Sequence, residues 1–305
     1  MKNLTDLSQF QELKNLEFVA RHVVEGFITG LHKSPFHGFS VEFAEHRLYN
    51  TGESTKHIDW RLYARTERLY IKRYQEETNL RAHILIDTSS SMYFPYNQQI
   101  LNKLNYAAVC AASLIYLLRK QRDAVGLTFF SDEVNFNSES KLSPVHAKLL
   151  FSKLDNLISQ KPELNKITKV AKCLHQIADS IHKRSLVIIF SDMFDSGSEE
   201  DLFDALQHIK HNKHDVILFH VHDKLIEKDL KLENRPYKII DMESGETISL
   251  NAMEFKDVFK QRSKEYYEKI KLKCAQYQID FIEADIQGDF KQMLIPYLIK
   301  RSKLF

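Results

Sequence analysis

The sequence lacks several features that would place it in a specialised class. Among its 305 residues there are only three cysteines, Cys110, Cys173 and Cys274, and none forms a C-x-x-C pair. Such isolated cysteines indicate packed thiols in a reducing compartment. No stretch approaches the roughly 18 apolar residues of a membrane span, and the N-terminal segment has no apolar core of signal-peptide length. We therefore expect a cytoplasmic protein without a membrane span.

The chain also lacks an excess of charge of either sign. It carries 43 Lys and Arg against 41 Asp and Glu, which gives a formal net charge of +2. This balance provides no overall field that would recruit nucleic acid or an anionic membrane. Hydrophobic residues make up 43% of the chain and charged residues 28%, which is ordinary for a soluble globular protein.

Strand-like and helix-like segments alternate from residue 82 onward. Strands are predicted at 82–87, 124–130, 186–190, 216–221 and 279–283, with amphipathic helices between them. This alternation predicts an α/β fold, with a doubly wound, mostly parallel sheet flanked by helices. Residues 1–80 are expected to form an N-terminal helical and aromatic extension, and residues 81–305 the α/β domain. A hairpin insertion is predicted at about 236–250.

An unusual loop follows the first strand, where an apolar run ends in Asp87 and three serines. In an open parallel sheet, ligands bind beyond the carboxyl ends of the strands. Asp87, Ser89 and Ser91 offer three hard oxygens at alternate positions, which suits Mg²⁺ or Mn²⁺. Thr168, at a predicted helix start, and Asp192, after the strand at 186–190, have the same character. We expect these five residues to form one metal site.

The metal loop resembles a known signature. D-T-S-S-S is similar to the D-x-S-x-S motif of von Willebrand factor A domains, whose metal-ion-dependent adhesion site also uses a later Thr and a later Asp. Thr168, in I-T-K-V-A-K-C-L, and Asp192, in V-I-I-F-S-D-M-F-D, look like those two residues. Met193 stands where many members carry Gly. The resemblance implies a von Willebrand factor A-like fold with Rossmann-type topology.

An upstream run narrows the resemblance. R-L-Y-N-T-G-E-S-T-K-H-I-D-W-R-L-Y-A-R is similar to the signature R-x-Y-x-x-G-D-x-x-R-x-I-D-W-x-x-x-A-R of the domain-of-unknown-function 58 family, with Glu53 and Lys56 as mild departures. The likeness covers about residues 38–300. Family members are typically encoded beside MoxR-type AAA+ ATPases and are thought to act with them as adaptors in assembling or activating other proteins.

The resemblance therefore implies a non-enzymatic, metal-dependent protein–protein interaction module. The implied partners are a MoxR-type ATPase and an unknown client protein. A metal shell of hydroxyls with only one or two carboxylates leaves the ion undercharged, so a carboxylate of the client would complete it. Many relatives begin with two membrane spans, which this chain lacks.

An enzyme is the first alternative, because an Asp at a strand end can be a nucleophile in Mg²⁺-dependent phosphoryl transfer. Asp87 would carry that reaction, but Ser89 stands where haloacid-dehalogenase-type enzymes have a second Asp. The sequence has no Gly-rich phosphate loop and no nucleophile elbow for acyl transfer. We therefore expect no enzymatic activity and assign no catalytic residue.

Two further alternatives concern binding. The stretch 45–74 is rich in Arg and Tyr, a composition found in RNA-binding platforms, but interleaved acidic residues neutralise most of its charge, so no nucleic-acid partner is expected. His208 and His211 lie one helical turn apart, and His220 and His222 share a strand face, which makes a zinc site conceivable. The favoured interpretation is that the helix histidines are solvated and that the strand pair lies at the end of the sheet.

Overall fold

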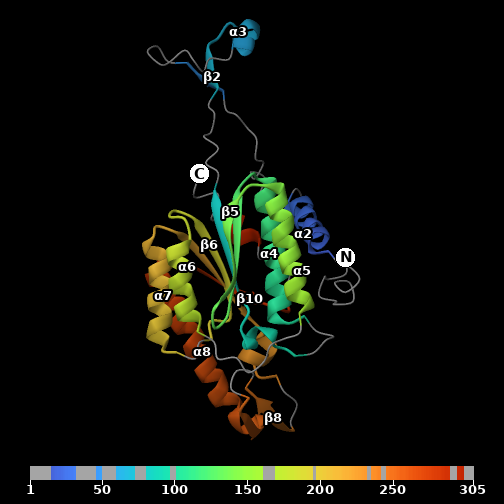
Figure 1. Ribbon diagram of the computed structural model, residues 1–305, viewed down its shortest axis with the longest axis vertical. Coiled ribbons are helices and arrows are strands. Elements are labelled where there is room, and N and C mark those ends of the chain that lie inside the picture. Colours follow the sequence, from blue (N-terminus) through green and yellow to red (C-terminus); the bar gives the residue numbers. More distant parts are fainter. Residues whose placement is uncertain are drawn as a thin grey trace. The chain divides into compact units, whose positions relative to one another are not determined.

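The computed structural model describes residues 15–31, 46–49, 60–72, 80–96, 101–160, 169–194, 197–231, 235–241, 245–288 and 294–298. The chain divides into two compact units. One unit is Ile28–Asn79, and the other combines Met1–Phe27 with Leu80–Phe305. The larger unit contains the α/β domain, shown in Figure 1. Among the described residues, no helix is long and apolar enough to cross a membrane.

The α/β domain is built on a six-stranded sheet. Its strands are β3 (Arg81–Asp87), β4 (Ala124–Phe130), β5 (Val134–Lys141), β6 (Leu186–Ser191), β7 (Asp215–His222) and β10 (Asp280–Asp285). They lie in the order β10-β7-β6-β3-β4-β5. All neighbours pair in parallel except β5, which runs antiparallel to β4. The predicted doubly wound, mostly parallel sheet is confirmed.

The side of β3 on which successive strands are added changes between β5 and β6, so the switch point of the sheet lies between β3 and β6. From β3 the chain builds β4 and β5 on one side, and it then returns to the other side of β3 to build β6, β7 and β10. Ligands of open α/β sheets bind at such a switch point, outside the carboxyl ends of the two strands. Ile86 pairs with Phe190, so the ends of β3 and β6 lie side by side. The fold therefore presents a candidate ligand position between these two ends.

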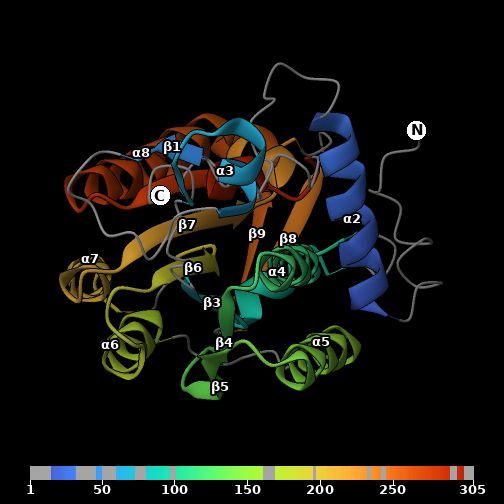
Figure 2. The same ribbon diagram turned by 90° about the horizontal axis from the view of Figure 1, so that it is seen from above.

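Helices cover both faces of the sheet. On one face lie α4 (Lys103–Lys120), α5 (Pro144–Ser159) and the first turns of α2 (Leu16–Leu31), and on the other lie α6 (Val170–Ser180), α7 (Glu199–His211) and α8 (Ala252–Gln276), as Figure 2 shows from above. An ion pair of 2.7 Å between Glu17 and Arg119 ties α2 to α4. Every residue of β6 is buried, as expected for a central parallel strand with helices on both faces.

Two short helices, a hairpin and a helical segment at 294–298 also belong to the larger unit. The 3-10 helix η2 (Ser90–Tyr93) follows β3, and the π-helix η3 (Lys224–Lys228) follows β7. Strands β8 (Pro236–Ile240) and β9 (Thr247–Asn251) pair antiparallel as a hairpin before α8. Because η2 and η3 come directly after strands β3 and β7, they lie at the carboxyl edge of the sheet. They supply residues to the candidate site.

The smaller unit contains β1 (His46–Leu48), α3 (Trp60–Thr66) and β2 (Tyr70–Lys72). β1 and β2 pair antiparallel, and the Trp60 and Tyr63 rings meet edge to face with centroids 6.1 Å apart. An open pocket of about 540 Å³ is lined by Tyr49, Tyr63, Glu67, Arg68 and Leu69. This unit holds the described part of the Arg- and Tyr-rich stretch.

Candidate metal centre

The carboxylate of Asp87, the last residue of β3, is held from two sides. Asp87 is fully buried. Its Oδ1 accepts a hydrogen bond of 2.9 Å from the backbone N–H of Ser89, and its Oδ2 accepts one of 2.6 Å from the Ser191 hydroxyl at the end of β6. The neighbouring strand therefore helps to orient this carboxylate. Both ends of the switch point take part in the same polar cluster.

The hydroxyls of Ser89 and Ser91 form a hydrogen bond with each other, with their Oγ atoms 3.1 Å apart. Adjacent ligands of an octahedral Mg²⁺ shell lie roughly 3 Å apart, because Mg–O bonds are about 2.1 Å long. Ser89 precedes η2 but makes no side-chain capping hydrogen bond there. A helix-capping role therefore does not explain this serine, whereas the spacing fits two neighbouring metal ligands.

Asp87 lies in an environment that opposes its negative charge. Burial, together with the like charge of Asp192, raises the pKa of the Asp87 carboxyl to about 7, against the partial compensation of its hydrogen bonds from Ser191 and Ser89. A bound divalent cation would favour the ionised carboxylate, because it supplies the opposing charge that the site lacks. The donor set of Asp87, Ser89 and Ser91 thus fits Mg²⁺ or Mn²⁺.

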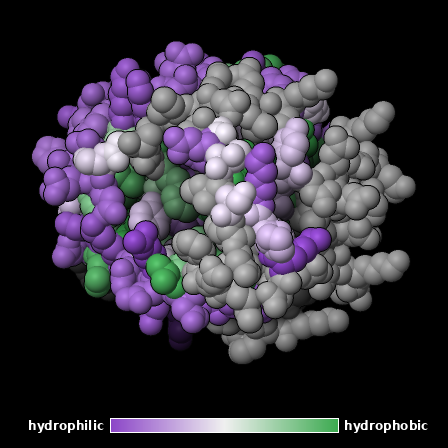
Figure 3. Space-filling view, turned by 90° about the horizontal axis from the view of Figure 1, so that it is seen from below, coloured by the Kyte–Doolittle hydropathy of each residue, from purple (hydrophilic) through white to green (hydrophobic). Residues whose placement is uncertain are grey.

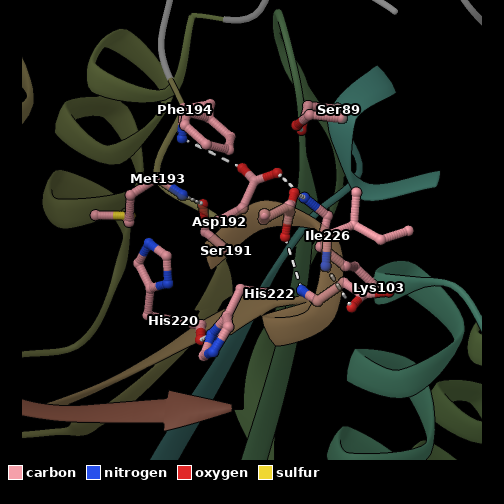
Figure 4. A network of polar contacts seen from close by, with 12 residues as sticks. Ser89, Lys103, Ser191, Asp192, Met193, Phe194, His220, His222 and Ile226 are labelled. Atoms are coloured by element: carbon pink, nitrogen blue, oxygen red, sulfur yellow. Dashed lines mark hydrogen bonds and ion pairs between the residues drawn. The ribbon is translucent and has the colours of Figure 1, made fainter. Parts of the chain in front are cut away.

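Asp192, which directly follows β6, is also fully buried but has different partners. Its Oδ2 accepts a hydrogen bond of 2.7 Å from the ammonium of Lys103, and its Oδ1 accepts one of 3.2 Å from the backbone N–H of Phe194. Figure 4 shows the Asp192 carboxylate between these two donors. Both oxygens of Asp192 are therefore engaged by the protein itself.

Lys103 is the first residue of α4 and has no exposed surface. Its Nζ lies 2.7 Å from Asp192 Oδ2 and 2.7 Å from Glu227 Oε1, so one ammonium bridges β6 and η3. Burial acts to lower the pKa of Lys103, but the charges of Asp192 and Glu227 outweigh it, so the pKa is raised above its ordinary value. The lysine therefore carries its charge inside the protein.

The backbone conformation of Met193 bears on the Gly-to-Met difference noted in the sequence. Its backbone has a φ of 56°, in the left-handed region that favours glycine. The Met193 side chain is fully buried, its N–H donates to Ser191 Oγ at 2.8 Å, and its carbonyl accepts from the Tyr266 hydroxyl at 2.5 Å. The backbone at this position thus favours glycine, and packing and hydrogen bonds hold a methionine there.

The structure brings together most of the residues expected to form the metal site. Asp87, Ser89 and Ser91 share one loop, and Asp192 lies at the same edge of the sheet, close enough for its charge to act on Asp87. Thr168 lies outside the described residues. Sequence reasoning missed Lys103 and Glu227. The sequence offered one sign that Lys103 is buried: this lysine stands beside Leu104 at the start of a helix whose other residues are mostly apolar.

The histidines do not form a zinc site in the described residues. His208 Nδ1 lies 2.9 Å from His175 Nδ1, between α7 and α6, whereas His220 and His222 are buried on β7 against Tyr267. Within the described ranges, no group of three or more His, Cys, Asp or Glu side chains is placed to hold a metal ion. The candidate centre differs from such clusters because two of its three proposed ligands are hydroxyls.

Exposed aromatic and aliphatic side chains lie on the segments that follow the strands at this edge of the sheet. Tyr96 follows η2, Phe194 follows β6 and Leu225 belongs to η3, and these three are 67%, 39% and 41% exposed. Figure 3 looks onto this edge of the domain and shows hydrophobic residues recessed among hydrophilic ones. Exposed apolar groups around a buried polar centre are typical of protein-interaction surfaces.

Comparison with known proteins identifies relatives. The sequence profile of the family described as "Protein of unknown function DUF58" matches residues 45–269. An uncharacterized protein of Mycobacterium tuberculosis is 27% identical over 105 residues, which cover 34% of this chain and 32% of that protein. The chain therefore matches about a third of the length of that curated relative.

Two solved structures are similar at low sequence identity. The conserved hypothetical protein BatB from Bacteroides thetaiotaomicron has a TM-score of 0.43 and 14% identity, covering 73% of this chain and 99% of that one. The SpRpn10 VWA domain has a TM-score of 0.35 and 14% identity, covering 70% of this chain and 94% of that one.

Proposed function

This chain belongs to the DUF58 family, and from that premise we propose that it is a non-catalytic, metal-dependent protein-interaction module. Asp87, Ser89 and Ser91 would hold Mg²⁺ or Mn²⁺. When bound, the ion supplies a Lewis-acidic position for an oxygen of another molecule. The observation that supports the proposal most is the pair of adjacent hydroxyls beside a buried, doubly hydrogen-bonded carboxylate.

The partner would be a client protein that presents an Asp or Glu. A shell with one carboxylate and two hydroxyls leaves a divalent ion short of negative charge, so an external carboxylate is attracted to it. The exposed side chains of Tyr96, Phe194 and Leu225 would contact the surface around that acidic residue. Apolar contacts around a charged anchor contribute affinity, while the charge contributes specificity.

We further propose that the module works in the cytoplasm with a MoxR-type AAA+ ATPase, as an adaptor in the assembly or activation of the client. The family resemblance of the segment from 47 to 77 supports this partnership. A pull-down of the ATPase and of acidic client proteins, with and without a chelator, tests it. Capture that is equal in both conditions would contradict a metal-dependent role.

Calorimetric titration with Mg²⁺ and Mn²⁺ tests the metal site. Wild-type protein is expected to bind one ion, and Asp87→Asn to lose the binding heat because the carboxylate ligand becomes neutral. Asp285→Asn is a matched control, since Asp285 is also the last residue of a parallel strand in the same sheet. A heat signal that is unchanged in Asp87→Asn would contradict the proposed site.

A further inference from the structure

The two strand-end aspartates differ in their partners, and this difference has a consequence for the metal shell. We infer that Lys103 is a built-in counter-ion of Asp192 that keeps this carboxylate out of the metal shell and leaves Asp87 as the ion's only carboxylate ligand among the described residues. The inference rests on the proposed function, because it concerns the composition of the same site.

The geometry of Lys103 supports this role. Its ammonium is enclosed by Asp192 and Glu227 at 2.7 Å each, and the rings of Phe94 and Phe194 lie with centroids 5.9 and 5.6 Å from Nζ. The rings add favourable contacts to the cation and limit access of water. An ion ligated directly by Asp192 would lie close to this ammonium, and the repulsion between the two positive charges in a buried site opposes that position.

The balance of charge at the site leads to the same conclusion. Asp192 and Glu227 share the ammonium of Lys103, whereas the buried carboxylate of Asp87 is bonded by hydroxyl and backbone donors. Lys103 serves Asp192 and Glu227, so the position left for the cation is at Asp87, beside the hydroxyls of Ser89 and Ser91.

Keeping Asp192 away from the ion affects binding of the partner. The number of charged ligands sets how tightly an oxygen site holds a divalent cation. A shell with Asp87 alone holds the ion less tightly, and it keeps the ion more attractive to a carboxylate from outside. Because of Lys103, tight binding of the ion depends on the acidic residue that the client supplies.

A double-mutant cycle on metal affinity tests the inference. The variant Lys103→Met/Glu227→Gln removes the ammonium and one carboxylate together, so that Asp192 is freed without two buried charges being left unpaired. Asp192→Asn is then introduced into both backgrounds, and the Kd for Mg²⁺ is measured by calorimetry, with Mn²⁺ as a second probe. Thermal unfolding establishes that each variant is folded.

The expected result is a coupling between Lys103 and Asp192. Lys103→Met/Glu227→Gln should bind Mg²⁺ roughly tenfold more tightly than wild type, a factor within the range seen for residues behind metal ligands. Asp192→Asn should weaken binding roughly tenfold in that variant but only about threefold or less in wild type. The same factor in both backgrounds would overturn the inference, because Asp192 would then play the same part with and without Lys103.

The outcomes separate this inference from the proposed function. Binding by Lys103→Met/Glu227→Gln but not by wild type would support the role of Lys103 and overturn the proposed metal dependence. Equal Mg²⁺ affinity of wild type and this variant would overturn the inference and leave the proposed function standing. Absence of binding by both proteins would overturn both.

Discussion

Asp87 and Asp192 occupy equivalent places in the fold but differ in chemistry. Each lies at the carboxyl end of a central parallel strand, the two strands are neighbours, and both side chains are fully buried. Asp87 is bonded by hydroxyl and backbone donors, whereas Asp192 is bonded by the ammonium of Lys103. The sheet thus determines where each carboxylate lies, and residues of other helices and strands determine which hydrogen bonds and ion pairs it forms.

The largest expected effect concerns the Asp192 side of this comparison. Lys103→Met leaves Asp192 and Glu227 as buried carboxylates without their cation, and breaking a buried ion pair costs about 3–5 kcal/mol. The free energy of unfolding, measured with urea, should fall by that amount. Lys120→Met, in the last turn of the same helix at an exposed position, serves as the matched control. A loss equal to that of the control would show that Lys103 is not the counter-ion of these carboxylates.

An intermediate effect is expected at the contact that joins the two strand ends. Ser191→Ala removes the donor to Asp87 Oδ2 and the acceptor for the Met193 N–H, which leaves buried polar atoms unsatisfied. We expect a loss of about 1–3 kcal/mol in unfolding free energy.

The control for that substitution is Ser113→Ala. The Ser113 hydroxyl is buried as well, but it donates to the Val109 carbonyl within α4, so its loss should cost less than about 1 kcal/mol. Equal losses in the two variants would mean that the contact between Ser191 and Asp87 does not stabilise the site.

The smallest expected effect concerns Met193, where a glycine variant should be more stable than an alanine variant, the reverse of the usual order. Truncation of this buried side chain destabilises the protein, but glycine relieves the left-handed backbone and alanine does not, so Met193→Gly should be more stable than Met193→Ala by about 1 kcal/mol. At Met92, which is equally buried in η2, alanine should be the more stable replacement. Denaturant midpoints of the four variants check this ranking, and the same order at both positions would refute the strain argument.

Much of the fold follows from the sequence because central parallel strands are apolar throughout. The predicted strand at 124–130 has the observed bounds of β4, and the run before Asp87 is β3. A helix is predicted between the strands at 82–87 and 124–130, and the observed helix α4 begins at Lys103 because Asn102 caps it by accepting from the Asn105 N–H. Boundaries depend on such local hydrogen bonds, which periodicity does not reveal.

The candidate site was accessible to sequence reasoning only in part. The spacing of Asp87, Ser89 and Ser91 lies within one loop, so it can be recognised as a motif. The bridge from Lys103 to Asp192 and Glu227 joins residues 89 and 124 positions apart, and the chain order alone does not bring them together. A buried cation among carboxylates emerges only when α4, β6 and η3 are packed.

The most direct test of the account is the position of a bound ion in crystals grown with Mn²⁺, located by its anomalous scattering. We predict one ion at the end of β3, ligated by Asp87, Ser89 and Ser91, with the ammonium of Lys103 still bonded to Asp192. A structure without an ion at this position, or one in which Asp192 ligates the ion and Lys103 has moved away, would contradict the account.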